Sequence, residues 1–230
     1  MTEREKLLGR VREALTLSAP HPAELSHGHG PEITFTGRPV TQARGWLPSG
    51  GETFDEQCAA FAKASLELKT DFRQLNSRAE AGAVLKEIAA AQKWQRIASH
   101  RTEATDAVCS SIELPLLRVD GGYDVHALEK CDAGITECDA LIAQTGSVLV
   151  SSRSAGGRAL SVLPPHHVVL ARREQMVPDL TAAFALARKK YAPDYPSMLS
   201  FITGPSRTGD IERILVLGAH GPKQLTVLFF

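Results

Sequence analysis

Apolar residues recur every three or four positions in four segments of the chain, and this spacing predicts amphipathic helices. The first three begin at Thr2, Thr53 and Ser77. Each is followed three positions later by a glutamate, the spacing of a capping box, in which side chains satisfy the free amides of the first helical turn. A fourth helix is predicted from about Pro178 to Tyr191, with proline in the first turn, where its missing amide hydrogen is not needed.

Short runs of β-branched and other apolar residues, separated by glycine and proline, predict strands. They are centred on Ile97 or span residues 116–119, 147–150, 168–171, 200–203, 214–217 and 225–230. Strands mixed with helices along one chain are typical of a layered α/β domain. The 230 residues are enough for one such domain with an N-terminal appendage.

The N-terminal appendage is predicted to consist of a helix and a linker, residues 1–31, followed by an α/β domain at residues 32–230. Prolines and glycines interrupt regular structure from residue 18 to about residue 31. This stretch also holds His21, His27 and His29. A histidine-rich tract can bind metal, but without a rigid frame a solvated linker is the favoured interpretation.

Composition narrows the function classes. Lys plus Arg and Asp plus Glu are 26 each, so no basic excess favours nucleic acid or an anionic membrane as the main partner. No apolar run is long enough to span a membrane, and the charged N-terminus does not resemble a secretory signal, so a cytoplasmic location is expected. The four cysteines form no C-x-x-C pair, which favours reduced, buried thiols over a zinc or iron–sulfur site.

The first cluster of candidate chemistry spans residues 134–147. If the chain is extended at Glu137 and Asp139, their carboxylates project to one side and can share acid–base work. Thr145, Gly146 and Ser147 offer hydroxyls and a close backbone approach to an anion. The pattern alone favours the alternative, a hydrogen-bonded turn with a solvated acidic edge.

Two further clusters follow predicted strands, at residues 202–212 and 218–222. Ser206 and Thr208 can donate to a carboxylate or phosphate, and Asp210 can cap a helix or act as a base. His220 can carry a proton or serve as a turn residue. Arg158 can clamp an anion.

Two adjacent histidines, His166 and His167, follow Pro164-Pro165. If they enter a strand, one faces a cleft and the other points away. A structural placement is favoured over a metal site for this pair.

Together these motifs form an ordered series that resembles the C-terminal half of the LutC/YkgG family of lactate utilisation proteins, which carry a LUD domain. The motifs are Phe201-Ile202-Thr203-Gly204-Pro205-Ser206-x-Thr208-x-Asp210-Ile211-Glu212, Leu217-Gly218-x-His220-Gly221-Pro222, Thr145-Gly146-Ser147 and Leu163-Pro164-Pro165-x-His167. The resemblance covers roughly residues 134–230, and the opening helix also resembles the family's start. Each motif alone is weak, but the series is specific.

The resemblance implies an α/β/α sandwich with a mainly parallel sheet, like that of ribose-phosphate isomerases and CoA transferases. It implies a role in the oxidation of L-lactate to pyruvate alongside two partner proteins, at least one of which carries iron–sulfur clusters. No cofactor is expected in this chain itself. The expected ligand is a small carboxylate or phosphorylated molecule, and a homo-oligomer is possible.

Two positions depart from the family pattern. Thr136-Glu137-Cys138-Asp139 stands where the family usually has Thr-Gly-Ala-Asp, and Gln144 stands where it usually has glutamate. Glutamine cannot act as a base, so catalysis through that position is not expected. Asp139 is retained, and a similar stretch in methylthioribose-phosphate isomerases supplies a catalytic aspartate, an analogy at the level of the fold.

The sequence therefore predicts one site near the C-terminal motifs. Its predicted catalytic residues are Asp139, Asp210 and His220. Its predicted ligand-binding residues are Thr136, Glu137, Thr145, Gly146, Ser147, Arg158, Ser206, Thr208, Glu212 and Gly221, and no metal is expected.

Two other functions stay open at this point. One is a stand-alone sugar-phosphate isomerase or CoA-transferase-like enzyme, in which Glu137 or Glu212 could be the nucleophilic carboxylate. The other is a non-catalytic assembly subunit that docks iron–sulfur partners through its N-terminal helix.

Overall fold

The computed structural model describes residues 5, 8, 9, 48–208, 216, 217 and 220–230. The chain divides into two units, Met1–Trp46 and Leu47–Phe230. Residues 5, 8 and 9 are helical, as predicted for the first helix. The rest of that helix, the linker with its three histidines and the predicted boundary after residue 31 lie outside the described residues.

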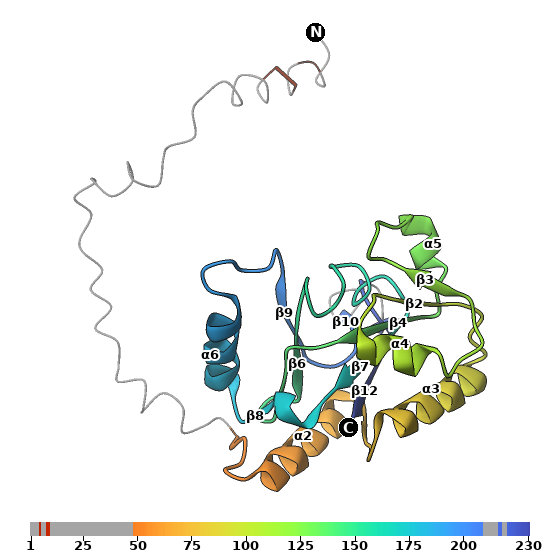
Figure 1. The fold of residues 1–230 in the computed structure, drawn as a ribbon. Coiled ribbons are helices and arrows are strands. Elements are labelled where there is room, and N and C mark those ends of the chain that lie inside the picture. Colours follow the sequence, from red (N-terminus) through yellow and green to blue (C-terminus); the bar gives the residue numbers. More distant parts are fainter. Residues whose placement is uncertain (1–4, 6–7, 10–47, 209–215, 218–219) are drawn as a thin grey trace. The chain divides into compact units, whose positions relative to one another are not determined.

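The second unit is built on a six-stranded sheet in which every neighbouring pair of strands is parallel (Figure 1). Its order is β1-β12-β7-β4-β2-β3. The strands are β1 (Asp71–Gln74), β12 (Gln224–Phe229), β7 (His166–Ala171), β4 (Ala133–Glu137), β2 (Ile97–Ser99) and β3 (Leu116–Arg118). The prediction of an α/β domain with a mainly parallel sheet is confirmed.

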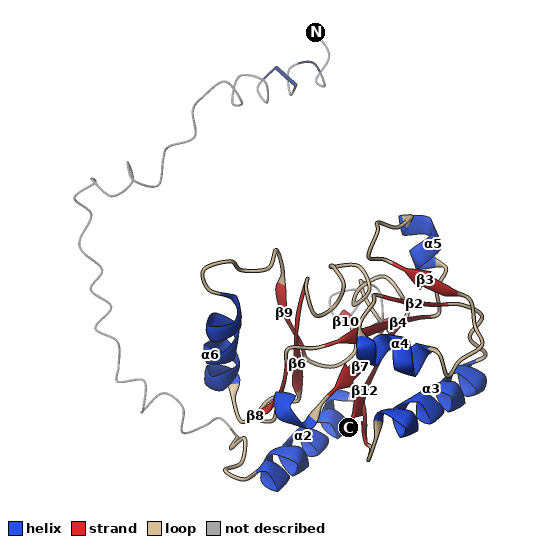
Figure 2. Cartoon of the chain, viewed as in Figure 1, coloured by secondary structure: helices blue, strands red, loops and turns tan. Residues whose placement is uncertain are grey.

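Helices and strands alternate from Phe54 to Glu137, and strands predominate in the rest of this unit (Figure 2). The helices are α2 (Phe54–Leu68), α3 (Arg78–Gln92), α4 (Glu103–Cys109), α5 (Val125–Glu129) and α6 (Leu180–Tyr191). The capping box predicted at Thr53 and Glu56 is present at the start of α2. None of the helices in the described ranges is both long and apolar enough to span a bilayer.

Two predicted helix starts need correction. Ser77 caps α3 by accepting from the amide of Glu80, but the Glu80 carboxylate binds Asn76 instead of returning to Ser77. Pro178 lies outside α6, because the side chain of Asp179 caps that helix. Aspartate accepts from the first-turn amides better than the residues around it can, so it determines where the helix begins.

Both faces of the main sheet are covered, because successive side chains of a strand point to opposite sides. Val168 and Leu170 of β7 belong to the apolar cluster formed with α3 and α4. Val169 and Ala171 belong to the cluster formed with α2. The sheet is therefore the middle one of three layers, with helices on both of its faces.

A second, four-stranded sheet was not predicted from the sequence. Its order is β8-β5-β6-β9, and its strands are β8 (Met176–Val177), β5 (Ala140–Ile142), β6 (Ser147–Ser151) and β9 (Leu199–Ile202). Helix α6 covers it through Ala183, Ala187 and Tyr191. A short ribbon joins β10 (Arg207–Thr208) to β11 (Val216–Leu217).

The loop from residue 152 to residue 165, between β6 and β7, lies directly on the main sheet. A Cβ at Gly134 would stand 2.3 Å from the Leu160 carbonyl oxygen, so only glycine fits under this loop. At Gly156, where φ is +61°, a Cβ would stand 2.3 Å from the Cβ of His100. These two close approaches fix the course of the loop over β4 and β2.

Candidate functional site

Charged side chains gather where β4 and β7 end, at the carboxyl edge of the main sheet. Glu137 is the last residue of β4, and Arg172 directly follows the last residue of β7. Because the strands are parallel and adjacent, these residues lie side by side, and Arg172 Nη1 is 2.8 Å from Glu137 Oε1. Ligands of open α/β sheets bind at this edge.

Asp139 is the centre of the buried part of this edge. It is 3% exposed, and its Oδ1 accepts from Lys190 Nζ and from the Tyr191 hydroxyl, each at 2.5 Å. Its Oδ2 accepts from Ser154 Oγ at 3.0 Å. The hydroxyls of Tyr191 and Ser151 are 2.9 Å apart, which extends the network to β6. A buried carboxylate with three donors, one of them a cation, is well satisfied.

The two α6 residues at Asp139 have raised pKa values. Burial alone would lower the pKa of Lys190, but the hydrogen bond and charge of Asp139, together with Tyr191, outweigh it. Burial raises the pKa of Tyr191, and the hydrogen bond to Asp139 adds to the effect. At neutral pH Lys190 is therefore a cation and Tyr191 is a neutral donor.

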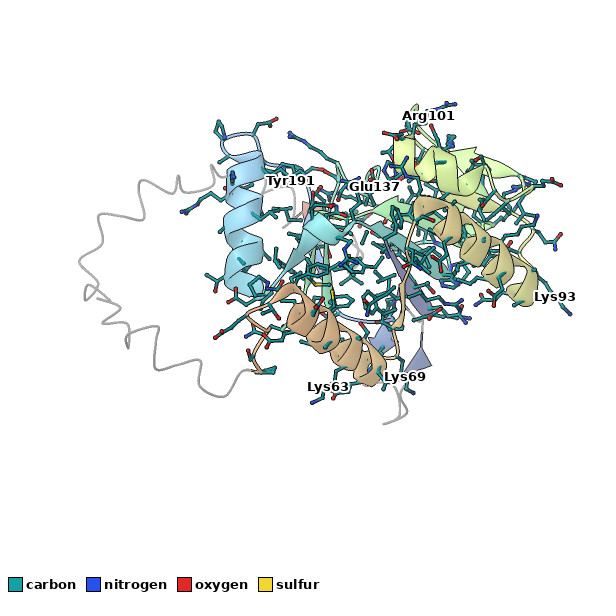
Figure 3. All side chains as sticks on the ribbon, turned by 60° about the horizontal axis from the view of Figure 1, so that its bottom comes forward. Lys63, Lys69, Lys93, Arg101, Glu137 and Tyr191 are labelled. Carbon is teal, nitrogen blue, oxygen red and sulfur yellow. The ribbon has the colours of Figure 1, made fainter. Side chains whose placement is uncertain are left out.

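These groups border a cavity of about 380 Å³. Its lining comprises Glu137, Cys138, Arg153, Ser154, Arg172, Lys190 and Tyr191. Figure 3 labels two of them, Glu137 on β4 and Tyr191 on α6. Arg153 forms an exposed ion pair with Asp194, Nη2 to Oδ2 at 2.5 Å. We call this cavity, with Asp139 beside it, the carboxyl-edge site.

His100 follows β2 and is 3% exposed. Among the described residues, neither of its ring nitrogens has a hydrogen-bond partner. Burial lowers its pKa, while the charge of Glu137 opposes that shift. Its carbonyl accepts from Arg118 Nη1 at 2.6 Å and from Thr105 Oγ1 at 2.7 Å, which holds the residue in place.

Glu137 and Asp139 do not form the pair of interacting carboxylates that the sequence suggested. Each has its own cation, Arg172 for Glu137 and Lys190 for Asp139. Glu137 ends β4, whereas Asp139 lies in the short link that leads into β5 of the second sheet. The arrangement suits binding of an anion among cations more directly than it suits proton sharing between two acids.

The predicted Thr-Gly-Ser segment is engaged within the protein. Thr145 Oγ1 donates to Ser147 Oγ at 2.7 Å, and Ser147 Oγ lies 2.8 Å from Thr203 Oγ1. Gly146, with φ +63°, allows close packing on α2, since a Cβ there would stand 2.8 Å from the Cβ of Ala64. These residues tie β6 to the loop after β9 and do not line the carboxyl-edge site.

Other predicted residues lie elsewhere or are not described. The exposed Arg158 donates through Nη2 to the Ser197 carbonyl at 2.6 Å. Thr208 is in β10, paired with Val216. Asp210 and Glu212 lie outside the described residues.

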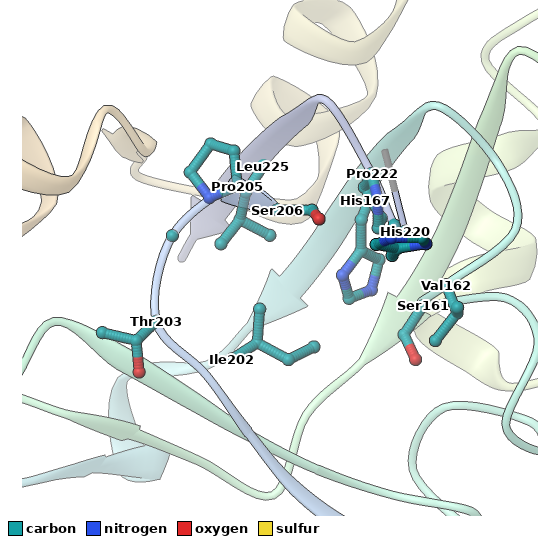
Figure 4. A pocket seen from close by; sticks show the side chains of 12 residues that line it. Ser161, Val162, His167, Ile202, Thr203, Pro205, Ser206, His220, Pro222 and Leu225 are labelled. Carbon is teal, nitrogen blue, oxygen red and sulfur yellow. The ribbon is translucent and has the colours of Figure 1, made fainter. Parts of the chain in front are cut away.

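The remaining predicted residues surround a second cavity, shown in Figure 4. Ser206, His220 and Gly221 line it together with His167. Thr136 is buried behind it and contacts His167, with Oγ1 and Nε2 2.9 Å apart. The predicted single site is thus divided between two edges of the sheet, because β4 and β7 run between them.

The adjacent histidines behave as expected for a strand. His167 faces the second cavity, while His166 points to the other side and is bound by Gln92 and by Thr226. The four cysteines are buried and unpaired, as predicted. Burial raises their pKa values, that of Cys109 to about 11, so they are thiols at neutral pH. No cluster of three or more metal-ligating side chains occurs in the ranges that the structure describes.

Sequence reasoning missed the basic and phenolic part of the carboxyl-edge site, namely Arg153, Arg172, Lys190 and Tyr191. Arg172 could have been found, because it directly follows a predicted strand. Lys190 and Tyr191 sit in a basic helix end that is explained equally well by the helix dipole.

Residues 125–230 match the LUD domain family. This stretch, just under half of the chain, is similar to a LUD domain. This domain holds β4 to β12 and all the residues that line the carboxyl-edge site, whereas β1, β2 and β3 of the same sheet precede the matched range.

Relatives of this chain include proteins named lactate utilization protein C. The one from Anoxybacillus flavithermus is 37% identical over 108 residues, which are 47% of this chain and 48% of that protein. The one from Geobacillus kaustophilus is 28% identical over 209 residues, 85% of this chain and 87% of that protein. The homology therefore extends beyond the LUD domain into the N-terminal part of the sheet.

A crystal structure of a DUF162 family protein from Deinococcus radiodurans has a similar fold. The TM-score is 0.60 at 20% identity, and the match covers 78% of this chain and 99% of that one. At this identity the likeness concerns the fold and nothing further.

Proposed function

We propose that this chain is a component of L-lactate utilisation that binds a small organic anion, such as a carboxylate, at the carboxyl-edge site. It acts with two partner proteins, at least one of which carries iron–sulfur clusters. The homology to proteins named lactate utilization protein C supports the role. We infer the class of ligand, a small anion, from three cationic side chains that line one cavity, namely Arg153, Arg172 and Lys190.

The two arginines are available to an incoming carboxylate. The side chains of Arg153 and Arg172 are 50% and 48% exposed. The pair of Arg153 with Asp194 is at the surface and is worth only about 0–1 kcal/mol, whereas Glu137, the partner of Arg172, is 16% exposed. A ligand carboxylate can therefore replace Asp194 at little cost and Glu137 at a larger one, and the planar guanidinium group fits a carboxylate with two parallel hydrogen bonds.

Asp139 has a different part in this proposal. Its buried hydrogen bonds to Lys190 and Tyr191 hold the ammonium at the edge of the cavity. Its Oδ1 already accepts from two donors and its Oδ2 from one, and the residue is only 3% exposed, so a ligand has little access to the carboxylate. We therefore assign Asp139 the role of positioning Lys190, and the cations the role of contacting the anion.

The binding half of the proposal is tested by titration calorimetry of the full chain with L-lactate and with pyruvate. We expect one of them to bind, and we expect Arg172→Gln and Lys190→Met each to weaken binding about tenfold, the loss of one charge-assisted hydrogen bond. Lys189→Met, one position away on the same helix, is the matched control and should bind like the wild type. Equal affinity in all four proteins would refute the site.

The physiological half is tested by growth on L-lactate after deletion of the gene in a strain without a second lactate-oxidising system. We expect no growth, with rescue by the wild-type and Lys189→Met genes and poor rescue by Lys190→Met. Normal growth of the deletion strain would refute the role in lactate utilisation, whatever the calorimetry shows.

A further inference from the structure

A second cavity, of about 230 Å³, lies at the opposite, amino edge of the main sheet. His167 of β7 and Leu225 of β12, which are paired in the sheet register, form part of its wall. Ile202 at the end of β9 and the loops around Ser206 and Pro222 complete it, as Figure 4 shows. The amide of Ser206 donates to the Pro222 carbonyl at 2.9 Å, so the two loops are fastened together. This site is independent of the proposed anion site.

His167 brings an unsatisfied polar atom to this cavity. The residue is 1% exposed, and its Nδ1 has no hydrogen-bond partner among the described residues. Leaving such an atom buried and unpaired costs about 1–3 kcal/mol. A ligand atom that paired with Nδ1 would recover that free energy.

The neighbouring threonine determines the kind of ligand atom. Thr136 Oγ1 and His167 Nε2 are 2.9 Å apart, and this is the hydrogen bond that the described residues give each of them. If Thr136 donates, Nε2 accepts and the ring proton lies on Nδ1. The other tautomer would leave both the Thr136 proton and Nδ1 unpaired, so the contacts favour an Nδ1–H donor. Burial lowers the pKa of His167 to about 3, so the ring is neutral at pH 7.

The rest of the lining is mainly uncharged. The described lining residues include no Lys, Arg, Asp or Glu, and His220 adds a second imidazole. Val162, Pro205 and Leu225 present apolar surface, and Ser206 and Ser161 add hydroxyls. A buried carboxylate or phosphate would lose its hydration here without gaining a cation, which is strongly unfavourable.

We infer that this amino-edge cavity binds an uncharged molecule with a compact apolar body and a carbonyl-type acceptor, which pairs with Nδ1–H of His167. The volume suits one ring with a short substituent, since an apolar cavity of roughly 150 Å³ holds benzene.

The test compares two probes that differ in one group, acetophenone and α-methylstyrene, in which CH2 replaces the carbonyl oxygen. In calorimetry with the full chain we expect acetophenone to bind about three- to tenfold more tightly, the worth of one hydrogen bond. Benzoate, the anionic counterpart, should not bind in this cavity. Lys190→Met at the other edge should leave acetophenone binding unchanged, which separates this result from the fate of the proposed anion site.

A spectroscopic readout covers the case in which a His167 variant fails to fold. In wild-type protein labelled with ¹⁵N-histidine, we expect the Nδ1–H tautomer of His167 and a shift of its Nδ1 resonance when acetophenone is added. His167→Phe should bind the two probes equally. An Nε2–H tautomer, equal affinity of the wild type for both probes, no binding of acetophenone or tighter binding of benzoate would each overturn the inference.

Discussion

The two edges of the six-stranded sheet have opposite chemistry. At the carboxyl edge, Asp139 is buried but accepts from three donors, one of which is the cation Lys190. At the amino edge, His167 is equally buried, but one ring nitrogen has no partner among the described residues. The cluster around Asp139 is charged and internally satisfied, whereas His167, like His100 beyond β2, is a buried imidazole with an unsatisfied nitrogen. A buried polar group therefore indicates a ligand site only when its hydrogen bonds within the protein are incomplete.

The same strands serve both edges. β4 places Thr136 behind His167 and, one residue later, Glu137 beside Arg172. The loop at residues 152–165 also reaches both, since Ser154 binds Asp139 and Ser161 lines the amino-edge cavity. Changes in this loop or in β4 can affect both sites, whereas the side chains of α6 act at one edge.

The largest effect is expected for Asp139→Ala, which removes the acceptor at the centre of the satisfied edge. Ser154, Lys190 and Tyr191 each lose a hydrogen bond, and we expect the free energy of unfolding to fall by about 3 kcal/mol. Urea denaturation measures it. Asp194→Ala, which breaks the exposed pair with Arg153, is the control and should change stability by less than about 1 kcal/mol. Similar small losses in both variants would contradict the central role of Asp139.

Gly134→Ala tests whether the loop at residues 152–165 couples the two edges. The new Cβ would stand 2.3 Å from the Leu160 carbonyl oxygen, so the loop must lift from the sheet. We expect a loss of about 2 kcal/mol in the free energy of unfolding, by overpacking, and weaker binding at both sites.

The control for this substitution is Gly121→Ala, where a Cβ would meet nothing within 4 Å and stability should hold. If Gly134→Ala weakens binding at one site alone, the loop does not connect the two edges.

Much of the fold was readable from the sequence because its signals are local. The capping box at Thr53 and the apolar run of β7 depend on residues that are neighbours in the chain. β4 was missed because it contains Gly134 and Glu137. It is nevertheless a strand because β2 and β7 pair with it on both sides. The second sheet was missed for a different reason, since β5 and β8 are only three and two residues long.

The candidate site was only partly predictable. Asp139 was recognised from its motif, but Lys190 is 51 positions further on, and only the packing of α6 on the second sheet brings the two together. The motif residues Ser206 and His220 were assigned to the same pocket as Asp139, although they line the amino-edge cavity. The order of the motifs suggested a single site, but it did not reveal that β4 and β7 separate these residues.

The pH dependence of the free energy of unfolding should show that the histidines of the amino edge are neutral in the folded protein. Burial lowers the pKa of His167 to about 3 and that of His166 to about 4, below the value of 6.5 in an unfolded chain. Between about pH 4 and 6.5 the unfolded chain therefore holds more protons, and the free energy of unfolding should rise with pH. Each histidine adds at most about 1.4 kcal/mol per pH unit.

The slope is measured by urea denaturation from pH 4 to pH 7. His167→Gln should lower the slope by the contribution of one histidine. His126→Gln, which removes an exposed imidazole, should keep the wild-type slope. An unchanged slope in His167→Gln would mean that this histidine is not held neutral in the folded protein.

The smallest effects concern the surface pairs of the charged edge. A double-mutant cycle on Arg172 and Glu137 should give a coupling free energy of about 1 kcal/mol, because water screens the half-exposed Arg172, although Glu137 is only 16% exposed. The cycle on Arg153 and Asp194, which is more exposed, should give a value near zero. Weak coupling is what allows a ligand carboxylate to displace Glu137 or Asp194. A coupling of several kcal/mol at Arg172 would mean that the pair is structural, and the anion site would then have to rely on Arg153 and Lys190.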